Sequence, residues 1–185
     1  MDGTLAIDEI YGRRLEIVRP DRAAIAWLSA RYIEEKITGA FETIAALQEA
    51  NVPVHIVSGG LREAILPFAA EAGIATNRVH AVDIVFAPDG SYRDFDQSSP
   101  LTRPDGKAVV CSTLGAGHKA LAMVGDGVTD VAARRAGAYV IGFGGVCARE
   151  AVRAAADVFV ESPDLRSVLD VLIGGEAAAL SSRSR

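Results

Sequence analysis

The sequence is poor in cysteine and contains no long apolar run. Cysteine occurs only at Cys111 and Cys147 among the 185 residues, and this pair does not have the spacing of a metal site or a disulfide framework. We therefore expect free thiols in a reducing compartment and a cytoplasmic protein. The longest apolar runs are far shorter than the roughly 20 residues that a membrane-spanning helix needs, so we expect no membrane partner.

Positive charge is also scarce. The chain carries 19 lysines and arginines against 24 acidic residues, a net charge of −5. A protein that binds a nucleic-acid backbone usually presents a broad basic surface, so we exclude nucleic acid as a partner, although a local basic pocket remains compatible with this charge. With half of its residues hydrophobic, the chain is long enough for one well-buried domain with a small insertion.

Apolar strand patterns alternate with amphipathic helix patterns along the chain. Strands are expected at 54–57, 79–86, 92–95, 120–124, 139–143 and 158–161. Helices are expected within 7–37, with a break at Pro20, and at 38–50, 61–73, 107–114, 131–136, 148–156 and 165–173. This alternation predicts an α/β fold of the Rossmann-like, three-layer kind, in which helices cover both faces of a mostly parallel sheet. The Asp89-Gly90 turn predicts a β-hairpin between 79–86 and 92–95.

The stretch 120–133 combines a buried strand with two carboxylates. Gly125 and Gly127 flank Asp126 at the end of the expected strand, and Asp130 follows on the opening turn of a helix. Ligands of open α/β sheets bind at the carboxyl ends of the strands, so both carboxylates can face one crevice and hold a metal ion. The alternative is a turn aspartate and a helix cap without a ligand.

Two further loops are expected at the carboxyl ends of strands, at 2–4 and 58–60, and Lys107 begins a helix. Carboxylates, a hydroxyl next to two glycines and a lysine are the components of a phosphoryl-transfer site. Each has an ordinary alternative, because Ser58 is a common turn residue and lysines such as Lys107 are usually exposed.

In their order and spacing these residues resemble the haloacid dehalogenase superfamily, and within it the phosphoserine phosphatase branch. The family's first motif reads Asp-x-Asp-Gly-Thr, and residues 1–4 supply all of it except the leading aspartate. Ser58 matches the second motif, Lys107 the third, and Asp126 with Asp130 the fourth.

The resemblance implies a division of the chain into core and cap. Residues 1–6 and 38–175 would form the α/β core, and residues 7–37 would form a short helical cap insertion. Residues 176–185 would be a flexible tail. The cap falls between the first two motifs, where this branch selects its substrate.

The resemblance also implies a magnesium-dependent phosphomonoester hydrolase that works through an aspartyl-phosphate intermediate. Asp2 would act as general acid and base and would bind Mg²⁺ through its carbonyl group. Asp126 would bind the metal directly, and Asp130 would orient a metal-bound water or the lysine. The implied phosphate and substrate contacts come from Ser58, Gly59, Gly60, Lys107 and Thr129. For Thr129, capping of the helix is an equal alternative.

The substrate implied by the resemblance is O-phosphoserine, cleaved to serine and phosphate. Glu9 matches the glutamate that meets the substrate amino group, and Arg14 matches the arginine that pairs with its carboxylate. Relatives carry some two dozen more residues between these two positions, so a pocket open to other small phosphomonoesters is an alternative. For Arg14 the other alternative is a solvated helix face.

The residue expected as nucleophile, two positions before Asp2, is not among the 185 residues. We expect a truncated or misassigned start in preference to an evolved inactive form, and little phosphatase activity from the 185-residue chain. A phosphate-binding or protein-interaction module without turnover and a phosphotransferase are the alternative functions. The expected partner is a small phosphomonoester, and the expected assembly is a monomer or homodimer.

Overall fold

The structure is a computed structural model that describes residues 7–174. By their contacts the residues fall into two compact units, which are described separately. Unit 1 comprises Met1–Glu35 and His55–Gly106, and unit 2 comprises Lys36–Val54 and Lys107–Arg185. The expected division into core and cap stays a prediction, and the expected tail at 176–185 lies outside the described residues.

Unit 1 contains two N-terminal helices, a parallel strand pair and a hairpin. Its helices are α1 (Ile7–Val18), α2 (Arg22–Glu34) and α4 (Arg62–Glu71), with short 3₁₀ turns at Thr76–Arg78 and Pro100–Thr102. Its strands are β1 (Ile56–Leu61), β2 (Val79–Val82), β3 (Ile84–Phe86) and β4 (Tyr92–Phe95).

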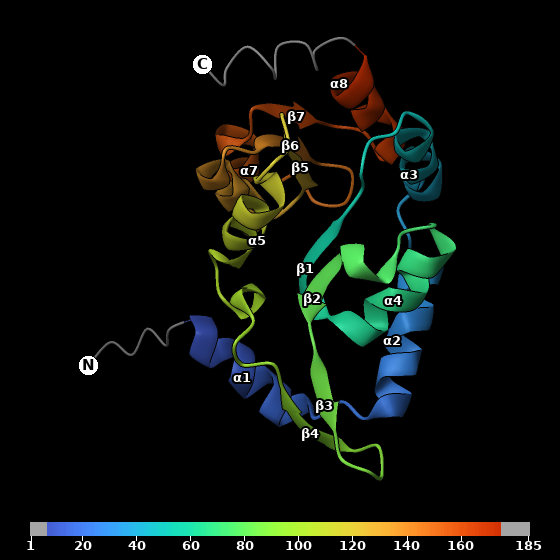
Figure 1. Ribbon diagram of the computed structural model, residues 1–185, viewed down its shortest axis with the longest axis vertical. Coiled ribbons are helices and arrows are strands. Elements are labelled where there is room, and N and C mark those ends of the chain that lie inside the picture. Colours follow the sequence, from blue (N-terminus) through green and yellow to red (C-terminus); the bar gives the residue numbers. More distant parts are fainter. Residues whose placement is uncertain (1–6, 175–185) are drawn as a thin grey trace, which may run out of the picture. The chain divides into compact units, whose positions relative to one another are not determined.

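The break at Pro20 is confirmed, because α1 ends at Val18 and α2 begins at Arg22. The Asp21 side chain accepts a hydrogen bond from the Ala24 amide at 2.8 Å, which satisfies one of the free amides at the start of α2. Helix α2 then runs beside α4 (Figure 1). The Ser29 hydroxyl donates to the Ala64 carbonyl at 3.0 Å across this contact.

The first strand differs from the prediction, which placed it at 54–57 and gave Ser58 to Gly60 to a loop. Strand β1 instead covers Ile56–Leu61 and pairs in parallel with β2. Val57 pairs with His80 and Leu61 with Val82, so β1 takes four residue steps where β2 takes two. Ser58, Gly59 and Gly60 therefore form a bulge inside the strand, which turns their backbone away from the regular ladder.

The expected hairpin is confirmed, but its first strand is split. The prediction joined 79–86 in one strand, whereas β2 pairs with β1 and β3 pairs with β4, in antiparallel fashion. The hairpin turn contains Gly90 at φ +85°, a conformation that glycine adopts without strain. The core of unit 1 connects helices α2 and α4 to the hairpin. Its buried residues are Ile25, Leu61, Ala64, Ile84 and Tyr92.

Unit 2 is built on a parallel sheet of three strands. The strands are β5 (Ala122–Gly125), β6 (Tyr139–Phe143) and β7 (Val158–Val160), in the order β5-β6-β7. The helices are α3 (Ala40–Glu49), α5 (Gly106–Gly115), α6 (Val128–Val131), α7 (Glu150–Ala155) and α8 (Leu169–Ile173), and 3₁₀ turns cover Ala132–Ala136 and Leu165–Val168. Val140 and Ile141 of the central strand are fully buried, as expected for a strand paired on both edges.

Two predicted helices of unit 2 are corrected by the structure. The helix predicted at 131–136 begins earlier, at Val128, and its second half is a 3₁₀ turn. The helix predicted at 165–173 is likewise a 3₁₀ turn followed by the short α8. Side-chain hydrogen bonds explain where both helical segments begin. Asp130 accepts a hydrogen bond from the Gly127 amide at the start of α6, and Asp164 accepts one from the Arg166 amide at the start of the 3₁₀ turn.

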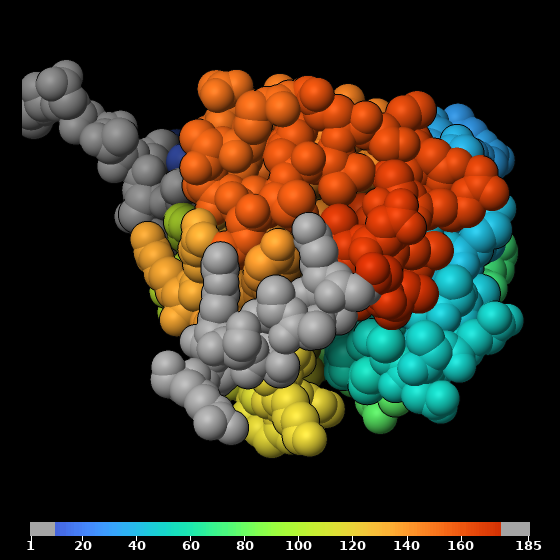
Figure 2. Space-filling view, turned by 90° about the horizontal axis from the view of Figure 1, so that it is seen from above, coloured from blue at the N-terminus to red at the C-terminus, as the bar shows by residue number. Residues whose placement is uncertain are grey.

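Helix α3 joins unit 2 through its first turn. Gly39 adopts φ +77°, and a Cβ added there would lie 2.1 Å from the Asp164 carboxylate. The Thr38 carbonyl accepts a hydrogen bond from the Leu165 amide at 2.9 Å. The surface of α3 consequently adjoins that of α8 (Figure 2). Within residues 7–174 no helix combines the length and the apolar character that crossing a membrane requires.

Candidate active site

In unit 2 the candidate site contains a largely buried ion pair. Lys107 Nζ lies 2.5 Å from Asp130 Oδ1, and the two side chains are only 18% and 8% exposed. The second carboxylate oxygen, Oδ2, accepts a hydrogen bond from the Gly127 amide at 2.9 Å. Both oxygens of Asp130 are thus occupied, and the carboxylate fixes the lysine ammonium in one place.

Glycine at position 125 makes this arrangement possible. A Cβ added to Gly125 would lie 2.2 Å from Asp130 Cγ and 2.3 Å from Oδ2, far inside van der Waals contact. Gly125 ends strand β5, so the carboxylate packs directly onto the backbone at the strand's carboxyl end. Any side chain at this position would displace Asp130 from Lys107.

Asp126 presents the second carboxylate of this segment. Its side chain is 43% exposed, and its Oδ2 lies 3.6 Å from an Arg149 guanidinium nitrogen. The Cys147 side chain and then the charge of Asp126 raise the pKa of Arg149 above its ordinary value. Arg149 therefore provides a cation beside Asp126 that reading the sequence did not identify.

Arg149 could have been found from topology. It follows β6, and β5 and β6 run in parallel with Gly125 paired to Gly142. The carboxyl ends of parallel neighbours meet at one edge, so the loop after β6 must pass close to Asp126. The missing information was which strands are neighbours.

The donor set agrees with a hard cation in type, because Asp126 and Asp130 offer only carboxylate oxygens. Between residues 7 and 174 there is no group of three or more His, Cys, Asp and Glu side chains that could hold a metal ion. Asp2, the third expected ligand, lies outside the described residues. With both oxygens of Asp130 engaged, Asp126 is the carboxylate left to meet a metal.

Unit 1 holds the candidate phosphate-binding segment, the bulge formed by Ser58, Gly59 and Gly60. Ser58 Oγ accepts a hydrogen bond from the Gly60 amide at 2.9 Å, and this bond leaves the hydroxyl proton free to donate elsewhere. A Cβ at Gly59 would lie 3.1 Å from the Leu101 carbonyl oxygen. Glycine thus suits the close backbone approach that this segment makes.

The remaining predicted residues lie on helices α1 and α6. Thr129 is a partly exposed residue of α6, and the hydrogen bond at the start of that helix comes from Asp130. Arg14 is an exposed residue of α1. Glu9 belongs to α1, but its side chain falls outside the description.

Comparison with known proteins identifies the family. A family model described as haloacid dehalogenase-like hydrolase matches residues 34–137, which is more than half of the chain. The chain belongs to the haloacid dehalogenase-like hydrolase family. This confirms the family indicated by the sequence motifs.

Relatives of this hydrolase indicate the branch. The chain is 34% identical to the phosphoserine phosphatase of Rattus norvegicus over 155 residues, which are 83% of this chain and 69% of the relative. It is 32% identical to the chloroplastic phosphoserine phosphatase of Arabidopsis thaliana, over 85% of this chain and 55% of that protein. The chain therefore spans only about half to two thirds of these relatives, and it is placed in the phosphoserine phosphatase-like branch.

Solved structures confirm the α/β fold. A phosphoserine phosphohydrolase-like protein from Francisella tularensis superposes with a TM-score of 0.74 at 26% identity, covering 94% of this chain and 80% of that one. A substrate-bound phosphoserine phosphatase complex superposes with a TM-score of 0.71 at 22% identity, covering 92% and 79% of the two chains. The second match supports the fold alone.

Proposed function

We propose that this hydrolase is a magnesium-dependent phosphomonoesterase that cleaves O-phosphoserine through an aspartyl-phosphate intermediate. The observation that supports this most is the buried Lys107–Asp130 pair beside Asp126, at the carboxyl end of β5. A fixed ammonium and a partly exposed carboxylate that follows the same strand suit a reaction in which negative charge develops on a phosphoryl group.

Lys107 acts on the phosphoryl group by charge. Asp130 holds its ammonium at 2.5 Å and the Gly127 amide holds Asp130, so the lysine does not have to be ordered when the substrate binds. A group positioned before the reaction stabilises the transition state without a reorganisation cost. Ser58 and the amides of the bulge donate to the other phosphoryl oxygens.

Asp2 protonates the leaving serine oxygen, which gives the free hydroxyl, and then activates the hydrolytic water. The family motif places its nucleophilic aspartate two positions before the residue that Asp2 matches, and formation of the acyl phosphate divides one displacement into two easier steps. Asp126 and Asp2 would hold Mg²⁺, with Asp130 in support, and the metal would supply positive charge to the phosphoryl oxygens.

Glu9 and Arg14 select the substrate by pairing with its amino and carboxylate groups, while Thr129 contacts it near the phosphoryl group. The short interval between Glu9 and Arg14 favours a second candidate, a phosphatase for another small phosphomonoester. A shorter cap insertion covers less of the substrate and therefore discriminates less between leaving groups.

Phosphate release from O-phosphoserine tests the proposal. For this test the chain is extended before Met1 by an apolar strand whose last residue is aspartate. In the matched control the last residue of the added strand is asparagine. We expect turnover only from the aspartate form, dependent on Mg²⁺ and abolished by EDTA. Equal turnover by the asparagine form would exclude the aspartyl-phosphate route, and a folded aspartate form without turnover would exclude the hydrolase.

The substrate is tested with the same form and its Arg14→Ala variant. For O-phosphoserine we expect Arg14→Ala to raise KM, because a charge-assisted contact is lost. For p-nitrophenyl phosphate, which lacks the carboxylate, the variant should behave like the parent enzyme. An unchanged KM for both substrates would favour the second candidate.

A further inference from the structure

The turn between α1 and α2 places two arginines on the hairpin of unit 1. Arg19 and Arg22 stand on either side of the buried Pro20. Arg19 Cζ lies 5.5 Å from the centroid of the Tyr92 ring, and Arg22 Cζ lies 4.4 Å from that of the Phe86 ring. Phe86 and Tyr92 are the cross-strand pair next to the hairpin turn, so their side chains share one face of the hairpin. Both guanidinium groups are thus held by cation–π contacts to one pair of rings.

Arg19 adopts a backbone conformation that arginine usually avoids. Its φ is +43°, in the left-handed region where a helix commonly ends on glycine. A residue with a Cβ is strained there, and such strain persists only where the surrounding structure holds it. The Arg19 guanidinium provides this hold, because it donates to the Tyr92 carbonyl at 3.3 Å and also lies over the Tyr92 ring. The contact of its side chain therefore accounts for an arginine at this position.

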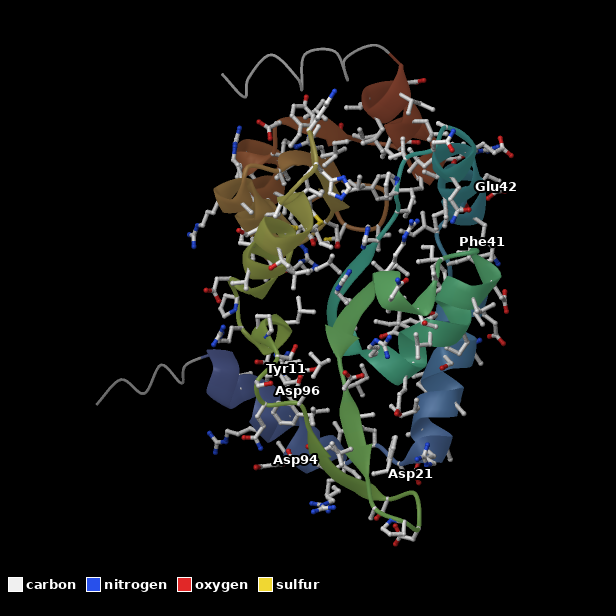
Figure 3. All side chains as sticks on the ribbon, viewed as in Figure 1. Tyr11, Asp21, Phe41, Glu42, Asp94 and Asp96 are labelled. Carbon is white, nitrogen blue, oxygen red and sulfur yellow. The ribbon has the colours of Figure 1, made fainter. Side chains whose placement is uncertain are left out.

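Helix α1 packs through one series of side chains. Tyr11 packs on Phe95 of β4 with ring centroids 5.4 Å apart, and Figure 3 shows it beside that strand. Leu15 packs against the buried core of unit 1, and Arg19 continues the series at the same spacing of four residues. Arg14 lies outside the series and is exposed. These contacts fix the helix and leave Arg14 open to solvent.

We propose that Arg19 is a positioning residue, which holds α1 against the hairpin so that Arg14 can pair with the carboxylate of the substrate. The inference rests on the proposed phosphomonoesterase function and adds to it the contact that fixes the substrate-selecting helix. All of these residues belong to unit 1. Without the contact to Tyr92, α1 spends less time in its binding position, and the apparent affinity falls in proportion. A substrate that lacks the carboxylate does not use Arg14 and is affected less.

Kinetics of the aspartate-extended enzyme test the proposal with Arg19→Gly and Arg19→Lys. Glycine removes the side chain but also relieves the positive φ, so urea unfolding should show little loss of stability. For Arg19→Gly we expect KM for O-phosphoserine to rise about three- to tenfold at nearly unchanged kcat, and KM for p-nitrophenyl phosphate to stay within about twofold. Arg19→Lys keeps a cation for the Tyr92 ring and should retain most of the affinity. The matched control Arg93→Gln removes an exposed arginine of β4 and should leave both KM values unchanged.

The outcomes separate this inference from the function on which it rests. An unchanged KM in Arg19→Gly beside a raised KM in Arg14→Ala would overturn the role of Arg19 and leave the phosphomonoesterase intact. An equal rise for both substrates, or a loss of stability that lowers both activities alike, would reduce Arg19 to a structural role and overturn the proposal. No turnover of O-phosphoserine by the folded parent enzyme would overturn the inference and the function together.

A double variant tests the route through Arg14. Because both residues act through one contact with the substrate, adding Arg19→Gly to Arg14→Ala should raise KM for O-phosphoserine no further. Two effects that multiply in full would contradict a role of Arg19 through Arg14.

Discussion

Replacement of Lys107 by methionine probes the ion pair on which the site of unit 2 depends. Methionine keeps the length of the side chain and removes the ammonium group. Asp130, only 8% exposed, is then left with the Gly127 amide at 2.9 Å as its remaining partner. The carboxylate can neither move far, because it packs on Gly125, nor reach water freely.

The expected loss of stability follows from this burial. Breaking a buried pair by removing one partner costs about 3–5 kcal/mol, because the other charge stays uncompensated. The lysine is 18% exposed, so some water reaches the pair and the lower end, about 3 kcal/mol, is expected for Lys107→Met. For a chain of this size that corresponds to a fall in Tm of about 6–12 °C.

Urea unfolding followed by circular dichroism measures this loss. The control is Lys119→Met, an exposed lysine of the same unit, for which a change within about 0.5 kcal/mol is expected. Adding Asp130→Asn to Lys107→Met should restore part of the stability, because the stranded charge is removed. If Lys107→Met unfolds at the same urea concentration as Lys119→Met, or if the two substitutions simply add, the buried-pair argument is refuted.

Three further predictions concern single positions. Gly125→Ala should destabilise the protein and displace Asp130, because the new Cβ would lie 2.2 Å from Asp130 Cγ. The control Gly115→Ala should not destabilise it, because the nearest neighbour of that Cβ lies at 3.7 Å. Urea unfolding compares the stability of the two variants. Burial, and then a nearby guanidinium, lower the pKa of His80 from its ordinary 6.5, so the unfolded chain binds more protons below that pH. Stability should therefore fall as the pH is lowered below about 6.5, and less steeply in His80→Asn; an equal slope in both proteins would contradict the shift. Tyr11, with a pKa of about 12, should be among the last phenols to ionise in an ultraviolet pH titration, and Tyr11→Phe should remove a late-titrating step.

Elements set by local patterns could be predicted from the sequence. The strand at Tyr139–Phe143 was predicted with the bounds that it has, because a short buried apolar run with a glycine on its flank leaves little freedom. The break at Pro20 and the hairpin turn at Gly90 follow from residues that fix φ or tolerate a positive φ. In each case the information lies within a few residues.

Features set by distant residues could not be predicted in this way. The two glycines after Ser58 indicate a loop, and only the pairing of Leu61 with Val82 reveals that the strand continues. The start of α6 was misplaced because its capping carboxylate comes from Asp130, inside the helix rather than before it.

The candidate site shows the same division. Motif spacing predicts Lys107, Asp126 and Asp130 as site residues, and predicts that Asp130 orients either a metal-bound water or the lysine. The structure shows the contact between Asp130 and the lysine. Arg149 was not identified, because it reaches Asp126 from the loop after β6, and the sequence does not specify that this loop lies beside β5.

The most direct test of the account is the kcat/KM for O-phosphoserine of the aspartate-extended enzyme and three variants. We expect Lys107→Met to lower it about 10²–10³-fold, as for loss of a preorganised charge, and Ser58→Ala to lower it at least about tenfold. Lys119→Met should match the parent enzyme. Wild-type kcat/KM in a folded Lys107→Met or Ser58→Ala variant would contradict the proposed phosphomonoesterase.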